Sequence, residues 1–133
     1  FPDHNSHWIF ERFGQLIPRV NHDHFMFNIK GLENLQYTKY GVDQHYNWHW
    51  DLSFGWENYQ RKMSVVLLLS DPDEYEGGEF EICNNGNFDD TWVSKPKKGD
   101  MIFFASWMPH RVRPVTSGTR KSLVGWVMGP REN

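Results

Sequence analysis

KGDMIFFASWMPHRVRPVTSGTRKSLVGWVM, residues 98–128, alternates short runs of apolar and branched side chains with turn-forming residues. The runs cover about Asp100–Phe104, His110–Arg113 and Arg120–Met128. Lys98-Gly99 precedes the first run, and Thr116-Ser117-Gly118 precedes the third. Short runs bounded by glycine and small polar residues are typical of β-strands. The stretch therefore predicts three short strands in succession.

The same pattern continues toward the N-terminus. Further strands are expected at about His45–Leu52, Met63–Ser70 and Gly78–Cys83, and side chains alternate through Phe25–Ile29 and Leu35–Lys39. Turn clusters separate these runs at Lys30-Gly31, Asp71-Pro72-Asp73, Gly77-Gly78 and Asn84-Asn85-Gly86. Short strands at even spacing favour a sandwich or a barrel.

One helix is expected, ahead of the strands. Apolar side chains recur with a period of about 3.6 residues at Ile9, Phe13, Leu16, Ile17 and Val20. Either Asn5 or Ser6 can cap the start of this segment. The spacing predicts a helix over about Ser6–Val20 that packs one apolar face on a sheet.

The length of the chain indicates a single domain. A core can form in 133 residues, whereas two ordinary domains need more. Residues 1–133 are therefore expected to form one domain. Because the chain begins at Phe1, we expect that domain to be truncated at its N-terminus.

The composition disfavours several classes of protein. A formal charge of -3 gives no basic stripe for phosphate backbones, so nucleic acid is not an expected partner. The longest apolar run, Val65–Leu69, is far shorter than the roughly 20 residues of a membrane span, so no membrane partner is expected. Cys83 is the only cysteine, which leaves no internal disulfide. A soluble protein, more cytoplasmic than secreted, is expected.

The segment His45–Asp51 contains a candidate pair of metal ligands, His49 and Asp51. On a strand the two side chains share a face, about 6.5 to 7 Å apart along the backbone. Together with a second imidazole they would form the facial triad that suits Fe(II). However, about one His-x-acid match is expected by chance in such a composition. From this segment alone, an exposed strand with solvated polar side chains is the favoured alternative.

Arg120 is a candidate ligand-binding residue in the C-terminal third. Alternation on its strand gives one face to Arg120, Ser122, Val124, Trp126 and Met128. A guanidinium group is a planar fork that binds a carboxylate through two parallel hydrogen bonds, and a neighbouring hydroxyl can add a third. The alternative is an ion pair of Arg120 with Glu79 or Glu81 at the barrel rim. The residues alone leave both readings open.

Several motifs agree in order, spacing and strand context over nearly the whole chain. They are Tyr40, His49-Trp-Asp51, Arg61-Lys-Met-Ser-Val-Val-Leu-Leu-Leu-Ser-Asp-Pro, Tyr75-Glu-Gly-Gly-Glu-Phe, Lys98-Gly-Asp-Met-Ile-Phe-Phe, His110-Arg-Val-Arg-Pro-Val and Gly118-Thr-Arg120-Lys-Ser122. The chain thereby resembles the Fe(II)/2-oxoglutarate-dependent dioxygenases of the prolyl 4-hydroxylase-like superfamily. The resemblance implies a mainly β fold, a double-stranded β-helix or jelly-roll barrel, with an N-terminal packing helix.

The resemblance also implies roles for individual residues. Iron would be held by His49, Asp51 and His110, and 2-oxoglutarate by Arg120 with added hydrogen bonds from Ser122 and Tyr40. Positions that surround the target proline in relatives acting on peptidyl proline are matched by Tyr46, Arg61 and Trp126. Read from the residues alone, these last three have alternatives: core aromatics for the two rings and a solvated strand-end charge for the arginine.

The implied activity is hydroxylation of a substrate C–H bond coupled to decarboxylation of 2-oxoglutarate to succinate. It requires Fe(II) and O2, with ascorbate as a reductant, and the expected partner is a proline-containing peptide or protein. One alternative is the same chemistry on another amino acid, a small molecule or a nucleobase. The other is a catalytically inactive jelly-roll binding module, which the intact triad and Arg120 disfavour. The oligomeric state is not predicted.

Two positions depart from the family pattern. Arg120 stands where collagen-type and algal prolyl 4-hydroxylases tend to have lysine, and Leu68 stands where several oxygen-sensing relatives have tyrosine. The subfamily is therefore not predicted.

Three further expectations concern segments around the motifs. Trp48 and Trp50 alternate away from the ligand face and are expected to pack under the helix. Glu57–Gln60 forms a polar loop that either closes over the cleft or is a plain surface connection. His22-Asp23-His24 is a second possible metal pair but is expected to lie on the surface.

Overall fold

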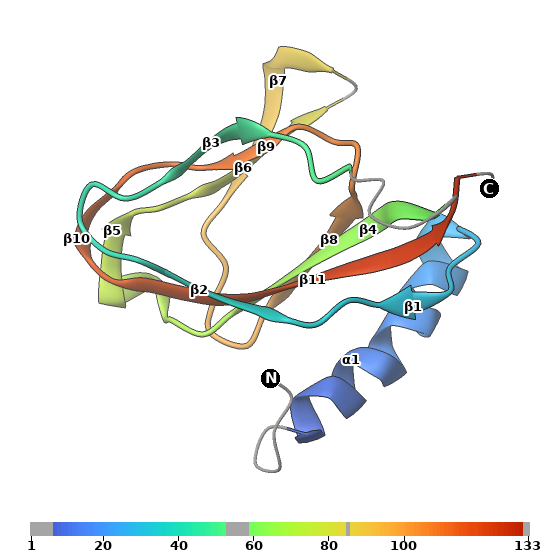
Figure 1. The fold of residues 1–133 in the computed structure, drawn as a ribbon. Coiled ribbons are helices and arrows are strands. Elements are labelled where there is room, and N and C mark those ends of the chain that lie inside the picture. Colours follow the sequence, from blue (N-terminus) through green and yellow to red (C-terminus); the bar gives the residue numbers. More distant parts are fainter. Residues whose placement is uncertain (1–6, 53–58, 85, 132–133) are drawn as a thin grey trace.

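The computed structural model describes residues 7–52, 59–84 and 86–131 (Figure 1). A helix, α1 (His7–Val20), and a π-helical turn, η1 (Asn21–Phe25), precede the strands. The strands are β1 (Gly31–Leu32), β2 (Gln36–Tyr40), β3 (Tyr46–His49), β4 (Tyr59–Leu68), β5 (Tyr75–Gly77), β6 (Phe80–Asn84), β7 (Asn87–Ser94), β8 (Met101–Ala105), β9 (His110–Val112), β10 (Val115–Gly118) and β11 (Arg120–Pro130), with a 3-10 turn, η2 (Pro72–Glu74), before β5. The mainly β prediction with one N-terminal helix is confirmed.

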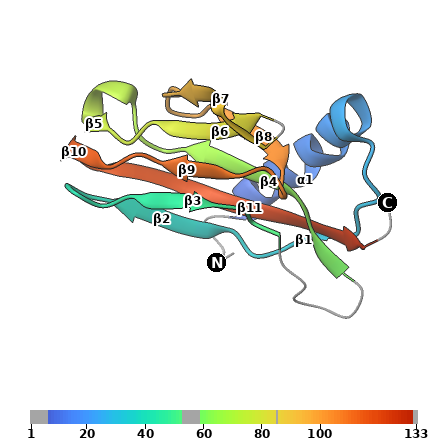
Figure 2. The same ribbon diagram turned by 90° about the horizontal axis from the view of Figure 1, so that it is seen from above.

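Two antiparallel sheets face each other (Figures 1 and 2). The larger sheet has the order β1-β11-β4-β8, with β2 also paired to β11, and the smaller has the order β3-β9-β6-β7. The β5–β10 pair lies at one end of the two layers (Figure 1). Facing sheets with these non-sequential neighbours are the jelly-roll arrangement expected above.

Helix α1 lies on the outer face of the larger sheet (Figure 1). Its side chains Phe13 and Ile17 are fully buried in one cluster with Met63, Val65 and Val127. The apolar spacing that predicted the helix is therefore the spacing that buries it, and the helix ends at the predicted Val20. Within the described part of the chain, no helix has the length and apolar character to cross a membrane.

Phe13 offers a test of this packing. Replacement of Phe13, which is 0% exposed, by Ala leaves a cavity between α1 and the sheet. We expect Phe13→Ala to lower the free energy of unfolding by about 3 to 5 kcal/mol, measured by urea denaturation. Trp8 is 61% exposed on the same helix. Trp8→Ala is the matched control and should change stability by less than about 0.5 kcal/mol. Equal losses in both variants would contradict this packing.

The strand predicted at Phe25–Ile29 is wrong. The side chain of Asn21 accepts a hydrogen bond from the backbone N–H of Phe27 and donates one to its carbonyl, both at 2.9 Å. Met26 between them adopts a left-handed conformation with φ of 57°. The Asn21 side chain thus takes the place of the neighbouring strand that would otherwise bond the backbone of Phe27. The alternation of apolar residues does not reveal such a side-chain contact.

Other strand boundaries moved for reasons of pairing. β4 begins at Tyr59 rather than Met63 because its first residues pair with the end of β11. β3 ends at His49, so Asp51 lies just beyond the strand rather than on it. The polar strand β7, NFDDTWVS, was not predicted, since it is an exposed edge strand without an apolar face. The short strands β5 and β10 were missed as well.

Strand β11 connects the core to the space between the sheets. Val127 packs beneath α1, whereas Ser122 and Trp126 line the space between the sheets. Pairing steps from Val127–Met63 directly to Met128–Arg61, which leaves a bulge at Lys62 in β4. The bulge brings the side chain of Arg61 onto the same face as that of Trp126.

Candidate active site

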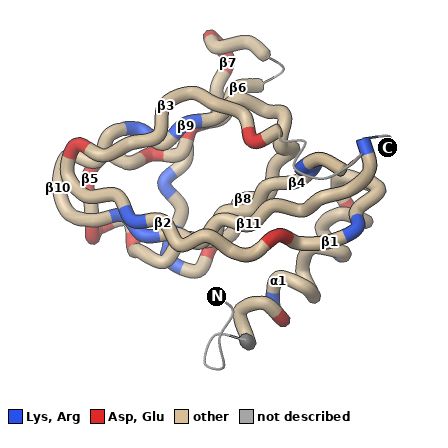
Figure 3. Tube along the Cα trace, viewed as in Figure 1, with Lys and Arg blue, Asp and Glu red and all other residues tan. Residues whose placement is uncertain are grey.

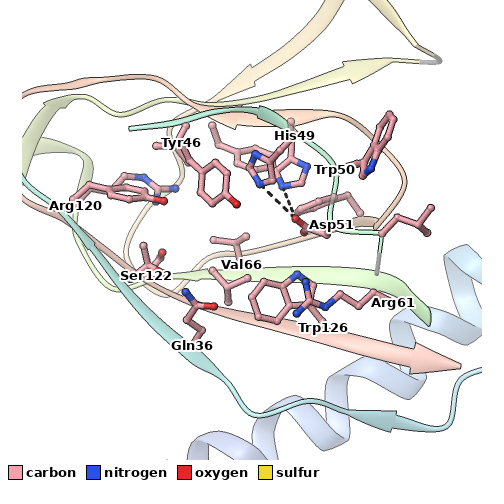
Figure 4. A pocket seen from close by; sticks show the side chains of 18 residues that line it. Gln36, Tyr46, His49, Trp50, Asp51, Arg61, Val66, Arg120, Ser122 and Trp126 are labelled. Carbon is pink, nitrogen blue, oxygen red and sulfur yellow. Dashed lines mark ion pairs between the residues drawn. The ribbon is translucent and has the colours of Figure 1, made fainter. Parts of the chain in front are cut away.

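A cavity of about 310 Å³ lies between the two sheets (Figure 4). Every residue assigned a role by the resemblance lines it: Tyr40, Tyr46, His49, Asp51, Arg61, His110, Arg120, Ser122 and Trp126. Phe80, Phe104 and Val112 add apolar walls. Segments far apart in the sequence thus meet in one enclosed space.

Three of these side chains converge at one end of the cavity. His49 at the end of β3 and His110 at the start of β9 are direct cross-strand neighbours, and Asp51 follows β3. The distances from Asp51 Oδ1 to His49 Nε2 and to His110 Nε2 are 3.4 and 3.3 Å. One potential ligand atom from each residue lies within 4.8 Å of the others. This triad is the one such grouping among the described residues.

The surroundings of the triad orient it for a metal. The Nδ1 atoms of His49 and His110 lie 2.7 and 2.9 Å from the carbonyl oxygens of Asn47 and Met108, which leaves both Nε2 atoms facing Asp51. A backbone carbonyl at Nδ1 selects the tautomer whose Nε2 has a free lone pair. Two imidazole nitrogens and one carboxylate oxygen are the donor set of the Fe(II) facial triad. The donor set therefore fits iron.

Asp51 is held as a carboxylate. Its Oδ2 accepts a hydrogen bond of 2.7 Å from Ser64, whose hydroxyl also lies 3.0 Å from that of Ser106. Burial opposes ionisation, but the imidazoles of His110 and His49, which donate to the carboxylate only when they are protonated, and the hydroxyl of Ser64 outweigh it and hold the pKa of Asp51 far below its usual range. A permanently charged oxygen is the form that ligates a divalent cation.

Arg120 lies at the other end of the cavity (Figure 4). It is 2% exposed, and its Nε and Nη2 atoms have no hydrogen-bond partner among the described residues. The hydroxyl-bearing Ser122, also buried, lines the same wall. A buried guanidinium with unused donors is costly unless a ligand satisfies it. The donors fit one carboxylate group of 2-oxoglutarate.

The alternative ion pair for Arg120 is not formed. Glu81 instead accepts hydrogen bonds from Arg111 Nε at 2.7 Å, Arg113 Nε at 3.0 Å and Thr91 Oγ1 at 2.7 Å. These partners lie with Glu81 on the outward-facing side of the smaller sheet, so Glu81 is committed to a different cluster. Arg120 therefore keeps its donors for the cavity.

The Glu81 cluster makes stability depend on pH. Burial opposes ionisation of Glu81, but hydrogen bonds from Thr91, Arg113 and Arg111 more than offset it and lower the pKa from 4.5 to about 2. Because the folded-state pKa is depressed, this stabilisation is complete above pH 4.5 and is lost as the pH falls toward 2. We expect Glu81→Gln to be less stable than wild type by about 1 to 3 kcal/mol at neutral pH, because solvent at the partly exposed Arg111 and Arg113 screens part of the interaction.

The difference between Glu81→Gln and wild type should shrink as the pH falls, because both then carry an uncharged group at this position. Urea denaturation from pH 7 to 2 measures it, and Glu76→Gln, at an exposed site on β5, is the control. A difference that stays constant with pH would show that the loss arises from packing instead of charge.

Tyr75 is a buried neighbour of Arg120 to which the sequence analysis gave no role. It is 2% exposed, and its hydroxyl has no hydrogen-bond partner among the described residues. Burial raises the pKa of Tyr75, while the charge of Arg120 and the approach of its guanidinium to the hydroxyl oppose this shift, so the two groups lie close together although their geometry does not make a hydrogen bond. The motif Tyr75-Glu-Gly-Gly-Glu-Phe contains this tyrosine. Its place in that motif is the only feature of the sequence that indicates a role in the site.

Replacement of Tyr75 by Phe should have opposite effects on ligand binding and on stability. Loss of one hydrogen bond in the Arg120 region should weaken 2-oxoglutarate binding by about 3- to 10-fold. The ligand-free protein should keep its melting temperature or gain slightly, because an unpaired buried hydroxyl is removed at constant shape. Tyr37→Phe, at a position 55% exposed, is the control. Unchanged affinity with reduced stability would assign Tyr75 to packing alone.

Arg61 and Trp126 form one wall of the cavity. The guanidinium of Arg61 lies 3.9 Å from the centre of the Trp126 ring and donates to Glu33, Nε to Oε2 at 2.8 Å and Nη2 to Oε1 at 3.3 Å. The interpretation of Arg61 as a solvated strand-end charge is therefore wrong. Glu33, which fixes its position, was missed because the two residues are far apart in the sequence and meet only where the segment after β1 and the start of β4 both lie against β11.

Tyr46 and Trp50 lie at the exposed side of the site. Tyr46 is 51% exposed and stacks on His49 with ring centres 3.6 Å apart, so it is not a core aromatic. Trp50 is 63% exposed and lines the cavity, whereas Trp48 packs against Phe88 and Arg111. The prediction that Trp48 and Trp50 pack under the helix is wrong because β3 belongs to the sheet that α1 does not cover.

Two remaining predictions concern segments outside the cavity. His22, Asp23 and His24 are exposed, as expected, with a hydrogen bond of 3.1 Å between the first two. Of the predicted polar loop, Glu57 and Asn58 lie outside the described residues, and Tyr59 and Gln60 belong to β4.

A family comparison agrees with this geometry. The family model described as the 2OG-Fe(II) oxygenase superfamily matches residues 35–128, which include the triad and Arg120. The chain belongs to the 2OG-Fe(II) oxygenase superfamily.

Within this class, the chain is similar to PKHD-type hydroxylases. It is 35% identical to one from Crocosphaera subtropica over 100 residues, which cover 74% of this chain and 44% of the relative. It is 33% identical to one from a Synechococcus species over 99 residues, covering 74% and 43%. The chain thus spans less than half the length of these curated relatives.

Solved structures show the same fold. A Pseudomonas putida prolyl-4-hydroxylase superposes with a TM-score of 0.75 at 22% identity, covering 99% of this chain and 68% of that one. A 2OG-Fe(II) oxygenase family oxidoreductase from Burkholderia pseudomallei gives 0.74 at 25% identity, covering 100% and 58%. The expected jelly-roll barrel is confirmed.

Proposed function

We propose that this chain is an Fe(II)- and 2-oxoglutarate-dependent hydroxylase, that residues 1–133 act as one catalytic domain, and that its substrate is a proline-containing peptide or protein. The observation that carries the proposal is the pairing of two incomplete sites in one cavity. A triad with two imidazoles and a carboxylate lies at one end, and a buried arginine with unused donors lies at the other. Iron would complete the first and 2-oxoglutarate the second.

Each side chain has a distinct task in this proposal. His49, Asp51 and His110 would hold iron, and Ser64 keeps the carboxylate of Asp51 oriented. Bound iron with 2-oxoglutarate and O2 would supply oxidative decarboxylation to succinate coupled to hydroxylation of a substrate C–H bond.

The end of the cavity away from iron would orient the co-substrate. Arg120 would bind its far carboxylate as a fork, and Ser122 and Tyr40 would add hydrogen bonds to it. Phe80 and Phe104 pack against His110, with ring centres 5.7 and 4.6 Å from the imidazole, and would limit the access of water to the metal end. Ascorbate is proposed as the reductant that keeps iron in the ferrous state.

Proline is the proposed target because of the rings at the mouth of the cavity. Tyr46, Trp50 and Trp126 present flat apolar faces to the cavity, and Arg61 is immobilised against one of them. A pyrrolidine ring packs well against such faces and makes no demand for a backbone N–H partner. The similar solved structures include prolyl hydroxylases, which supports the same choice.

The test is hydroxylation of proline-containing peptides by the Fe(II)-loaded protein with 2-oxoglutarate, O2 and ascorbate. Succinate release and addition of one oxygen atom to the peptide are measured by mass spectrometry. Matched peptides with alanine in place of proline are the substrate control, and His110→Ala is the protein control. Oxygen addition that requires both proline and His110 supports the proposal. Succinate release without oxidation of any proline peptide would reject the substrate class.

A further inference from the structure

A second hollow, of about 560 Å³, opens beside the cavity that holds the triad. It is lined by the segment Lys30–Asn34, which contains β1, together with Tyr59 at the start of β4 and Met128 near the end of β11. The proposed reaction uses none of these residues.

The two spaces share one continuous floor. The face of β11 that carries Ser122 and Trp126 continues to Met128, which pairs with Arg61 on β4 and with Gly31 on β1. Arg61 lines the first space and Glu33 the second, and the ion pair between them forms the common wall. A ligand that fills the first space and extends along β11 therefore reaches the second.

We propose that this second hollow binds the part of a peptide substrate that flanks the hydroxylated residue, and that it prefers an acidic side chain there. The inference rests on the proposed function, since it assumes that the substrate is a peptide. It adds a binding site and a charge preference that the hydroxylation chemistry does not require.

The distance between the spaces suits an extended peptide. Trp126 and Met128 are two positions apart on β11, and this spacing corresponds to about 7 Å along a strand. An extended substrate advances by about 3.3 Å per residue. The side chain in the second hollow would therefore belong to the second or third residue from the target.

The charges around the hollow favour an acidic partner. Glu33 is neutralised by its two hydrogen bonds from Arg61. Lys30 is exposed, lines the hollow and forms no ion pair with any described residue. Figure 3 shows basic (blue) and acidic (red) positions along the trace around β1. The charge that remains is positive, while Leu32, Tyr59 and Met128 supply apolar surface for the stem of an aspartate or glutamate.

The first test changes the charge of a peptide residue that flanks the target proline and the charge of Lys30 in the protein. Fe(II)-loaded protein with 2-oxoglutarate is given peptides with a central proline and Glu, Gln or Lys at each of the three flanking positions on either side. We expect wild type to prefer Glu over Lys at one position by about threefold to fivefold in kcat/KM. Lys30→Glu should invert that preference. Lys39→Glu makes the same change of net charge on an exposed position of β2 that lines neither space, and should not invert it.

The second test fills the hollow. A Cβ added at Gly31 meets nothing within 4 Å, so large side chains can be introduced there without a backbone clash. Gly31→Trp should lower kcat/KM for long peptides by more than about fivefold and leave peptides truncated next to proline unaffected. Gly31→Ala is the matched control for loss of the glycine, and it should turn over both peptide lengths normally. Unchanged 2-oxoglutarate binding shows that the variants are folded.

The outcomes separate the two proposals. Hydroxylated peptides whose flank preference is the same in wild type, Lys30→Glu and Gly31→Trp would overturn the flanking site and leave the proposed function intact. If no peptide is hydroxylated, both proposals fail together. Inversion by Lys30→Glu together with a length-dependent loss in Gly31→Trp supports both.

Discussion

Replacement of Arg120 by Met should abolish tight binding of 2-oxoglutarate while leaving the ligand-free protein as stable as wild type or more so. In the ligand-free protein the buried guanidinium has two donor atoms without partners. A methionine of similar length removes that unpaired charge and keeps the packing. Two charge-assisted hydrogen bonds to the ligand are lost, each of about 1.5 to 3 kcal/mol, so the dissociation constant should rise by at least about a hundredfold.

Anaerobic titration of the Fe(II)-loaded protein with 2-oxoglutarate measures this affinity through the weak visible charge-transfer band. Thermal unfolding of the metal-free protein measures stability. Lys121→Met removes the same charge from the neighbouring, exposed position on β11 and should leave the affinity unchanged. A large loss of stability in Arg120→Met, with affinity retained, would mean that Arg120 is a structural cation with a protein partner.

The elements that were predicted correctly are those whose apolar pattern is also their burial pattern. The spacing of Phe13 and Ile17 marks the face of α1 that contacts the sheet. The run through Val65 and Leu68 in β4 is buried on both faces, as its continuous apolar character indicates. In such elements, local sequence and tertiary packing make the same demand on each residue.

The elements that were missed depend on partners that lie far away in the sequence. β7 is polar and is a strand only because β6 supplies its hydrogen-bond partners. Tyr59 and Gln60 extend β4 because β11 is long enough to pair with them. The position of Asp51 likewise depends on a distant partner, since its backbone N–H donates to the carbonyl oxygen of Ser106 and not to a neighbouring strand. The side chains of His49 and Asp51 do lie close together, although the strand that was expected to present both residues ends at His49.

The candidate site was predicted largely through the motifs, and its supporting contacts were not. No spacing in the sequence links Arg61 to Glu33 or Tyr75 to Arg120, because each pair joins segments that are far apart in the sequence and come together only in the folded barrel. The alternative partner for Arg120 was rejected only when Glu81 was found with Arg111 and Arg113. Motifs identify residues that contact ligands, whereas the residues that position them depend on the tertiary fold.

The two ends of the cavity differ in how their polar groups are satisfied. At the metal end, Ser64 and two backbone carbonyls orient the triad in the absence of a ligand. At the other end, donors of Arg120 and the hydroxyl of Tyr75 have no partner among the described residues. Buried polar groups are rarely left in this state, and such exceptions concentrate at functional sites. We therefore expect 2-oxoglutarate to stabilise the protein more at the Arg120 end than at the metal end.

Asp51→Asn tests whether Asp51 is needed for its negative charge or for its structural role, because the substitution removes the charge and keeps the shape of the side chain. The amide oxygen can still accept the hydrogen bond from Ser64, and the shape is unchanged, so folding should be retained. The negative charge that an iron ligand supplies is lost. Loss of partners that only orient a ligand already lowers metal affinity by about 10- to 100-fold, so loss of the ligand charge itself should lower it by more than about a hundredfold. Hydroxylation and succinate release should fall below detection.

Anaerobic titration with Fe(II), monitored by calorimetry, measures the affinity for iron directly. It does not require the substrate to be known. Ser64→Ala should retain the charge of Asp51 and lose only its orientation, so its affinity should lie between those of wild type and Asp51→Asn. Asp43→Asn, at an exposed position, should bind iron as wild type does. An order in which Ser64→Ala binds iron more weakly than Asp51→Asn would mean that the Asp51 carboxylate orients the two histidines without ligating the metal itself.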